Sequence, residues 1–534
     1  MNISIYIVLV LINTLFFDLY NYAKVQNFNP VGWNLDYLRH HATSNNILQH
    51  LQIKGIYDSS ISDGPFLYAW PLPNAIYAGH IYIFGHTLGF ILSLIIFSVA
   101  SYITLYMFLR LLLDNELSKF GAFAGLCVSN GLVYYFFNGP ISFAQVSILH
   151  RVVNPLFSFP ILFLFMWSLL KTIKTSKSLY AIIAGLLFGS LFVSYIYFSV
   201  FAAFFSVVII FQEIFLRSEK EKIILLVNNL KIPLIYFILA TLPGVIIFAI
   251  NYIQLENLGQ IIIDWKQRAS LLETRSFIIE SSDWIHFLLL IPAFLISIFS
   301  YLNSSDSQKK QSTILIFFTY FSAWLASHSN VLTGISPQKT NFTAYLNFPF
   351  FTILICSSIF NILSFKRFNY YKYAKIFLVI AILLTLFNIN YIRAYSNKIQ
   401  KGEIELVNLS LSVSDDEIKL FKWLDSDAFK GNKILAKPYL SRRIAAFSEI
   451  DTYFVDYLSK VTNSTLRIRQ RVIESTFSKS TLSLNSLLDE MNKGNVTHII
   501  SSQKLDPLLP CIVEKTFGKI KVCRLNYSEN KQSI

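Results

Sequence analysis

The chain alternates between long apolar runs and short polar segments as far as about residue 392. A run such as His86 to Leu109 (HTLGFILSLIIFSVASYITLYMFL) is longer than the roughly 20 residues that a helix needs to cross the hydrocarbon core of a membrane. Such runs are bounded by charged residues or by Pro, Gly and Asn. The pattern therefore predicts membrane-spanning helices and not the strands of a soluble sheet.

Division of the runs at these polar boundaries predicts eleven membrane spans. The stretch 179–215 is counted as two spans, because a single helix there would be about 50 Å long and would exceed the bilayer. The amino-terminal run lacks the features of a cleaved signal peptide, so it is expected to remain as the first span. The predicted spans lie near 3–17, 87–110, 120–136, 155–170, 179–194, 195–215, 232–251, 285–301, 313–327, 346–364 and 376–392.

The Lys and Arg residues predict the orientation of these spans, because short basic loops remain in the cytoplasm. Alternate loops are short and basic, with Lys119, Lys171, Lys174, Lys177, Arg217, Lys220, Lys222, Lys309, Lys310, Lys366, Arg367, Lys372 and Lys375. The other loops, 18–86, 137–154, 252–284 and 328–345, are longer and less basic. We therefore expect a multi-pass protein of the cytoplasmic membrane, with the amino terminus inside and everything after about Tyr391 outside.

The composition of a soluble α/β domain begins near residue 393. Asn432 to Pro438 (NKILAKP) and Val496 to Ser501 (VTHIIS) resemble short buried strands. Residues 464–494 have the pattern of one helix that ends at Gly494. The sequence thus predicts a membrane domain, 1–392, with its first outer loop at 18–86, and a small extracytoplasmic α/β domain, 393–534.

Two cysteines flank a predicted hairpin near the carboxyl end, Cys511 to Cys523, with its turn near Gly518. If the strands pair about that turn, the two thiols are expected to lie opposite each other. An oxidising compartment would then allow a disulfide, and two unpaired buried cysteines are the alternative.

Composition and charge narrow the range of partners. The 534 residues are 54% hydrophobic and only 14% charged, whereas a soluble domain has roughly 25% charged residues. The net charge of +14 is explained by cytoplasmic loops that contact anionic membrane lipids. Because no basic run lies outside the loops between spans, nucleic acid is not expected as a partner.

The nine histidines all fall on or next to the predicted outer side, which indicates a functional outer surface. Long polar loops between spans are uncommon unless they carry function. These residues are His40, His41, His50, His80, His86, His150, His286, His328 and His498.

The order of these segments resembles that of the GT-C glycosyltransferases: one span, a long polar outer loop, many further spans and a small outer α/β domain. Gly55 to Gly85 (GIYDSSISDGPFLYAWPLPNAIYAGHIYIFG) is similar to their first outer loop, with its aromatic, proline-rich entry into a short helix. Glu417 to Pro438 (EIKLFKWLDSDAFKGNKILAKP) looks like the start of their outer domain. The resemblance implies an enzyme that transfers a sugar from a polyprenyl-phosphate-linked donor to a glycan, lipid or protein acceptor.

Such a transfer needs a carboxylate that accepts a proton or holds a metal, and cations that stabilise the phosphate leaving group. In the family the key acid lies in the first outer loop, which here contains Asp18, Asp36, Asp58 and Asp63. We predict that Asp36 is catalytic, because Arg39 and His40 lie within about one turn of it if this piece is helical. The alternative is an exposed ion pair of Asp36 with Arg39, which would contribute little.

The second outer loop ends with His150 and Arg151, directly before a span that begins at Pro155. Together with Arg39, these cations are predicted to bind the donor phosphate, and contact with ordinary phospholipid is the alternative. This loop contains no acidic residue, although many GT-C enzymes have one there. A two-carboxylate metal site is therefore less strongly indicated, and a divalent cation such as Mg²⁺ or Mn²⁺ is left open as a cofactor.

The third outer loop contains Asp264, Lys266 and Arg268 around a tryptophan. These three, with His40 and Asp63, are predicted to bind substrate, and an interfacial amphipathic helix is the alternative for the loop. A non-catalytic, transport or polymerase protein of cell-envelope polysaccharide assembly is the alternative function. A transporter is expected to have charged residues inside its spans or repeated halves. The sequence shows almost no such charges and no repeat, which favours the transferase.

Overall fold

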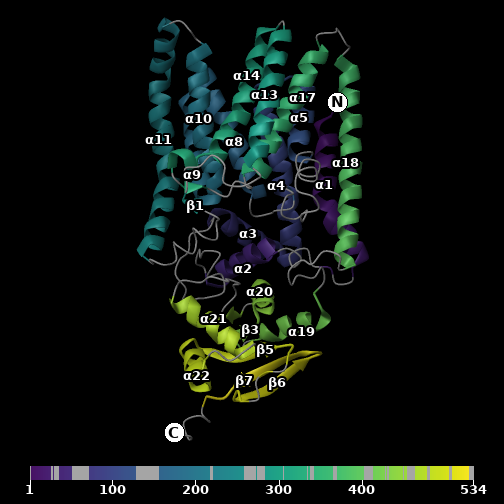
Figure 1. Ribbon diagram of the computed structural model, residues 1–534, viewed down its shortest axis with the longest axis vertical. Coiled ribbons are helices and arrows are strands. Elements are labelled where there is room, and N and C mark those ends of the chain that lie inside the picture. Colours follow the sequence, from purple (N-terminus) through teal and green to yellow (C-terminus); the bar gives the residue numbers. More distant parts are fainter. Residues whose placement is uncertain are drawn as a thin grey trace. The chain divides into compact units, whose positions relative to one another are not determined.

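The computed structural model describes most of the predicted elements (Figure 1). The described residues are 2–25, 28, 35–50, 71–127, 149, 155–216, 220–257, 272–273, 283–304, 306–333, 335–336, 342–364, 370–401, 413–426, 429, 432–448, 450–453, 464–477, 482–503, 505 and 508–527. Within some helices individual side chains, those of Asp36 and Arg39 among them, lie outside this part. The chain forms two compact units. Unit 1 comprises Met1–Phe17, Ser93–Ala249 and Lys266–Asn397, and unit 2 comprises Asp18–Leu92, Ile250–Trp265 and Lys398–Ile534.

Unit 1 is built from long helices that run side by side (Figure 1). Four of its helices, α1, α4, α11 and α18, continue into unit 2. The helices are α1 (Ile3–Lys24), α4 (His86–Leu109), α5 (Asn115–Cys127), α8 (Ser158–Thr175), α9 (Ser178–Ser194), α10 (Ile196–Leu216), α11 (Lys220–Asn257), α13 (Asp283–Asn303), α14 (Ser307–Ser327), α17 (Phe348–Ser364) and α18 (Tyr370–Gln400). Short elements complete the unit, namely α15 (Asn330–Thr333), the π-helix η4 (Thr343–Asn347), β1 (Leu272–Glu273) and β2 (Ile335–Ser336).

Each predicted span overlaps one of these helices, and the fold is that of a helical membrane protein. Residues 128–136 of the third predicted span lie outside the described part. In the described part, five helical segments are long and apolar enough to cross a membrane by length and composition. They are Ile3–Lys24, His86–Leu109, Ile196–Ile214, Ile224–Ile250 and Tyr373–Lys398. The number of eleven spans and their orientation stay predictions.

Small residues bring α9 and α11 into close contact. A Cβ atom added at Gly189 would lie 2.8 Å from the main-chain oxygen of Thr241, and one at Gly185 would lie 2.3 Å from that of Phe237. The Thr241 hydroxyl donates a hydrogen bond of 3.2 Å to the Gly185 oxygen. Where no hydrophobic effect drives helices together, such close packing of backbones holds them.

Amide side chains join α1, α5 and α18 inside unit 1. Asn388 Nδ2 donates to Asn13 Oδ1 at 2.8 Å and to the Cys127 main-chain oxygen at 3.1 Å. Asn13 in turn donates to Thr385 Oγ1 at 3.0 Å. These buried groups satisfy one another where water is absent, and they link the first and last long helices of the unit.

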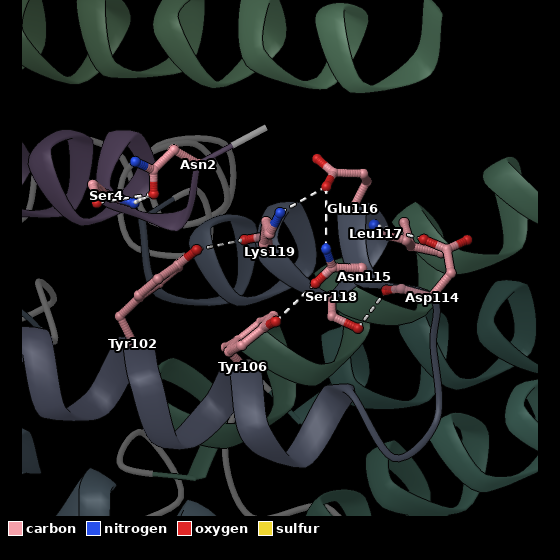
Figure 2. Close-up of polar contacts among 10 residues, drawn as sticks. All are labelled: Asn2, Ser4, Tyr102, Tyr106, Asp114, Asn115, Glu116, Leu117, Ser118 and Lys119. Carbon is pink, nitrogen blue, oxygen red and sulfur yellow. Dashed lines mark hydrogen bonds and ion pairs between the residues drawn. The ribbon is translucent and has the colours of Figure 1, made fainter. Parts of the chain in front are cut away.

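Polar side chains also gather where α4 turns into α5 (Figure 2). Lys119 and Glu116 are both buried, and their charged groups are 2.6 Å apart. Tyr102 donates a hydrogen bond to the Lys119 main-chain oxygen, and Tyr106 donates to Asn115 Oδ1. Lys119 thus lies on a helix and not in the loop that was predicted for it. The same correction applies to Lys171, Lys174, Lys220, Lys222, Lys309, Lys310, Lys372 and Lys375, whereas the side of the membrane stays a prediction. Helix α5 begins several residues earlier than expected, because Asp114 accepts a hydrogen bond from the Leu117 amide and caps its first turn.

The carboxyl-terminal part of unit 2 is a five-stranded sheet. Its strands are β3 (Lys433–Ala436), β4 (Asp451–Thr452), β5 (Val496–Ser501), β6 (Cys511–Phe517) and β7 (Ile520–Leu525), in the order β4-β3-β5-β7-β6. Strand β3 is parallel to β4 and β5, whereas β7 is antiparallel to β5 and β6. The two strands predicted from NKILAKP and VTHIIS are confirmed as β3 and β5.

Helices cover both faces of this sheet. Successive residues of a strand point to opposite faces, so Ile434 and Ala436 pack with α19 (Asp415–Leu424) and α20 (Pro438–Phe447). Leu435 packs on the other face with α21 (Ser464–Phe477) and α22 (Leu484–Lys493). The predicted α/β fold of this segment is confirmed, and the domain boundary at residue 393 stays a prediction.

Two details of this part differ from the prediction. The expected single helix over 464–494 is two helices, because the Ser483 side chain accepts a hydrogen bond from the Ser486 amide and starts α22. The hairpin turns at Gly518 as expected, but a bulge in β6 shifts the register. Val513 therefore faces Cys523, and Cys511 faces Leu525.

The two hairpin cysteines are diagonal neighbours and not the direct partners that we expected. Both thiols are free, and the Cys511 thiol is hydrogen-bonded to Cys523. Burial, together with that hydrogen bond, raises the pKa of Cys511 to about 12. A disulfide between them stays a prediction for oxidising conditions.

Candidate functional site

Two helices of the predicted first outer loop, α2 (Leu35–His50) and α3 (Pro71–Phe84), form the site in unit 2 together with α20. Asp36 is the second residue of α2, and Arg39 lies on the same helix. The segment is helical, which was the condition for Asp36, Arg39 and His40 to lie within about one turn. The remaining predicted site residues lie outside the described part, and these are Asp63, His150, Arg151, Asp264, Lys266 and Arg268.

Asp18 is another carboxyl group of the predicted first outer loop, and its side chain lies in the described part. It lies on α1, where its side chain is only 6% exposed. Its Oδ1 atom is buried and has no hydrogen-bond partner in the described part of the chain. A carboxyl group inside a membrane helix is costly and commonly functional, so Asp18 is a second candidate carboxyl group for the site.

His40 connects α2 to the start of α3. Its Nδ1 atom lies 3.1 Å from Asn74 Oδ1, and because an amide oxygen only accepts, Nδ1 carries the hydrogen. Ser44, one turn further along α2, donates to the main-chain oxygen of Asn74 at 3.0 Å. His40 is thus buried in a contact between helices, and its predicted role in substrate binding stays a prediction.

His41 is bonded through both of its ring nitrogens. Nδ1 lies 2.7 Å from the Tyr77 hydroxyl of α3, and Nε2 lies 2.7 Å from Nδ1 of His86, the first residue of α4. Burial lowers the pKa of His41 well below its usual value of 6.5, and His86 lowers it further. Burial also raises the pKa of Tyr77 well above its usual value. Both side chains are therefore uncharged at neutral pH.

Helix α20 packs onto this pair of histidines. The Phe447 ring lies 5.4 Å from the His41 ring and 6.0 Å from the His86 ring, centroid to centroid. We call His41, Tyr77, His86 and Phe447 the His41 cluster. It joins four helices, α2, α3, α4 and α20, through one buried imidazole.

Asn45 makes a second bond between α2 and α20. Its Nδ2 atom donates to the main-chain oxygens of Ala445 at 3.2 Å and Ser448 at 3.0 Å. The last carbonyl groups of a helix have no partner within the helix, so Asn45 caps the end of α20. The Ser448 hydroxyl donates to Asp425 Oδ1 at 2.7 Å, and the Asp425 carboxylate interacts electrostatically with His86.

An ion pair fixes α20 to the neighbouring helix α19. Arg443 Nη1 lies 2.8 Å from Glu417 Oε2, and the arginine side chain is 1% exposed. Glu417 also accepts a hydrogen bond from the Ser414 amide and completes the cap of α19. These two contacts connect α20, against which α2 packs, to the start of α19.

The site as described contains no set of metal ligands. No group of three or more His, Cys, Asp or Glu side chains that could hold a metal ion is found among the described residues. The predicted divalent cation thus stays a prediction.

Comparison with solved structures shows which fold this is. The archaeal oligosaccharyltransferase AglB from Archaeoglobus fulgidus, in complex with an inhibitory peptide and a dolichol-phosphate, is similar with a TM-score of 0.53 at 11% sequence identity. The match covers 93% of this chain and 69% of that one. The chain has a GT-C fold. The resemblance inferred from the arrangement of spans and loops is thereby confirmed.

Two further structures of the Archaeoglobus fulgidus oligosaccharyltransferase show the same GT-C likeness. One, tethered to an acceptor peptide containing the NVT sequon, has a TM-score of 0.53 at 11% identity and covers 93% of this chain and 68% of that one. The other, a complex with Zn and sulfate, has a TM-score of 0.50 at 11% identity and covers 93% and 67%. No protein-family model matches the chain, and no curated protein matches its sequence.

Proposed function

We propose that this protein is a membrane glycosyltransferase that moves a sugar from a polyprenyl-phosphate-linked donor to a glycan, lipid or protein acceptor on the outer face. The observation that supports the proposal most is the GT-C fold over 93% of the chain. The similar structures are bound to a dolichol-phosphate in one case and tethered to an acceptor peptide in another, which are a lipid-linked phosphate and an acceptor. The proposal includes an inner amino terminus and an outer domain at 393–534.

Asp36 is the proposed proton acceptor. The acceptor hydroxyl attacks the anomeric carbon of the donor sugar, the bond from that carbon to the phosphate oxygen breaks, and the hydroxyl proton passes to the carboxylate. Arg39, His150 and Arg151 are proposed to stabilise the negative charge that develops on the leaving phosphate. Because the described residues provide no set of metal ligands, no step is assigned to a metal.

The contacts of α2 support this assignment to its first turn. A carboxylate near the start of a helix is stabilised by the positive end of the helix dipole. Bonds from His40, His41 and Asn45 hold the following turns of α2 against α3, α4 and α20. A reacting group on a fixed helix keeps its orientation toward substrate, which is a large part of enzymatic rate enhancement. His40, Asp63, Asp264, Lys266 and Arg268 are proposed to contact the sugar or the acceptor.

Replacement of Asp36 by Asn tests the proposal. Membranes containing the variant are incubated with radiolabelled polyprenyl-phosphate sugars, and label transferred to endogenous glycan, lipid or protein is counted. Loss of general base catalysis is expected to reduce turnover by roughly 100- to 10,000-fold. Asp489→Asn is the matched control, because this exposed carboxylate on α22 pairs with Lys493 at the surface.

Asp18→Asn in the same assay separates the two candidate carboxyl groups. Undiminished turnover in a well-expressed Asp36→Asn protein removes Asp36 from the mechanism, and loss of turnover only in Asp18→Asn assigns the role to Asp18. Donor binding without turnover in the parent protein supports the alternative, a non-catalytic protein of envelope polysaccharide assembly.

A further inference from the structure

We propose that His41 and His86 form a pH-dependent clamp that holds α2 against α3, α4 and α20 as long as the pair carries no more than one extra proton. The consequence for catalysis rests on the proposed function, because α2 carries Asp36. His41 is then a positioning residue, which acts through the helix and does not itself touch substrate.

The number of hydrogens between the two rings determines whether they form a hydrogen bond. A neutral imidazole has one N–H group, so one nitrogen of His41 donates and the other accepts. The Tyr77 hydroxyl both donates and accepts, so it suits either tautomer. With no extra proton, the contact of 2.7 Å between His41 Nε2 and His86 Nδ1 is therefore an ordinary hydrogen bond.

One added proton keeps this bond, whereas two break it. A singly protonated pair still places one N–H group opposite one bare nitrogen. A doubly protonated pair places two N–H groups opposite each other at 2.7 Å, with two positive rings 4.9 Å apart. His41 has no exposed surface, so the second charge is also removed from water. The pair therefore separates when it takes up the second proton.

Among the residues that the structure describes, the groups around the pair do not compensate two charges. Helix α3 contributes the Tyr77 hydroxyl, which stays uncharged, and α20 contributes the Phe447 ring. The buried Arg443 of α20 is paired with Glu417 of α19. Burial of His86 opposes a positive charge there, and the Asp425 carboxylate offsets part of this for a single proton. This arrangement permits one positive charge and opposes a second.

The sign of the pH dependence follows from the lowered pKa of His41. When α2 separates, both imidazoles enter water and regain a pKa near 6.5. The separated state then binds more protons than the clamped state below that pH. The clamp is fully stable above about pH 6.5 and weakens as the pH falls. The equilibrium constant for separation of α2 rises about tenfold per pH unit for each proton taken up.

Hydrogen–deuterium exchange tests this without any substrate. The full-length protein in lipid nanodiscs is labelled at pH 7.5 and 5.0, and exchange rates are corrected for the intrinsic effect of pH. Uptake of one proton between pH 6.5 and 5.0 is expected to increase opening of α2 and of the end of α20 about thirtyfold. Helix α22, on the opposite face of the sheet from α20, is the internal control with unchanged protection.

Three variants distinguish a proton switch from simple packing. His86→Asn keeps an amide near the position of Nδ1 and does not titrate, and His41→Gln likewise keeps an amide near Nε2. Both are expected to keep α2 protected at pH 7.5 and to lose most of the thirtyfold response. Tyr77→Phe keeps both histidines, so its response to pH is expected to remain even where protection is lower at both pH values.

Equal protection of α2 at both pH values in the parent protein would overturn the proposal. An undiminished response in both His86→Asn and His41→Gln would also overturn it, because other groups would then be titrating. The exchange results do not depend on turnover. If Asp36→Asn keeps full activity while the clamp responds as expected, the proposed function fails and the clamp stands.

Discussion

The side chain of Arg443 is almost completely buried, and the Glu417 carboxylate compensates its charge. Both oxygens of Glu417 lie within 3 Å of Arg443 Nη1, and the same carboxylate caps α19. Removal of one member of a buried ion pair leaves the other charge without compensation in a medium of low dielectric constant. The pair contributes to the fold mainly through this penalty.

Replacement of Arg443 by Met is therefore expected to destabilise the carboxyl-terminal part of unit 2 by about 3 kcal/mol. Chemical unfolding followed by hydrogen exchange of α19 and α20 measures the change. The matched control is Lys493→Met, which removes a cation with a 62% exposed side chain and is expected to cost less than about 1 kcal/mol. Similar losses in the two variants would contradict the role assigned to burial.

Contacts between individual residues are the part of the structure that is hardest to predict from the sequence. In the sequence, His41 stands out only as one of nine outer histidines, and Tyr77 and His86 lie 36 and 45 residues away along the chain. No periodic pattern connects residues that far apart, because their contact depends on how α2, α3 and α4 pack. Asp36 could be proposed from its local neighbours alone, since Arg39 and His40 lie within one helical turn.

For helices and strands, the apolar pattern correctly predicts that an element is present, but it predicts the first and last residues of that element poorly. Burial of long apolar runs determines where the helices of unit 1 lie. Capping hydrogen bonds determine where helices begin in both units. Asp114 starts α5 and Ser483 starts α22, at positions that hydrophobicity does not indicate. The register of the β6–β7 hairpin depends on a bulge next to Glu514, which the turn at Gly518 does not reveal.

Glycine is required where α9 and α11 cross closely. Gly189→Ala places a Cβ 2.8 Å from the Thr241 main-chain oxygen, which cannot move without shifting the helix. The variant is expected to lose about 1 to 3 kcal/mol of stability, measured as a lower Tm in detergent. Gly79→Ala in α3 is the control, because nothing lies within 4 Å of its added Cβ. There a small gain of about 0.5 kcal/mol is expected, and equal effects at both sites would contradict the packing argument.

At the scale of the whole molecule, the fold tolerates very different side chains. The likeness to AglB extends over 93% of this chain at 11% identity, so the arrangement of helices is preserved with few shared residues. A pattern of spans and loops is therefore enough to predict the fold class. Specificity for the donor and the acceptor depends on individual side chains of the outer loops, and the pattern of spans and loops does not reveal it.

The proposed orientation of the whole chain is tested with reporters. Alkaline phosphatase fused after the last residue is expected to be active, because it folds only in an oxidising compartment outside the cytoplasm. A fluorescent protein fused at the same position is expected to stay dark. Fusions truncated after Lys310, near the predicted cytoplasmic end of α14, should give the opposite pair of results. Identical results at both positions would contradict the predicted topology.

Unit 2 is assembled from both ends of the chain, and this has a consequence for biosynthesis. The ribosome releases residues 18–92 long before residues 398–534, so α2 is synthesised well before α20, against which it packs. During that interval Asn45 and the ring of His41 lack their partners from the carboxyl end. A nascent chain that terminates early would leave this surface of α2 exposed. Quality-control proteases that recognise the exposed surface would then degrade incomplete chains and spare complete ones.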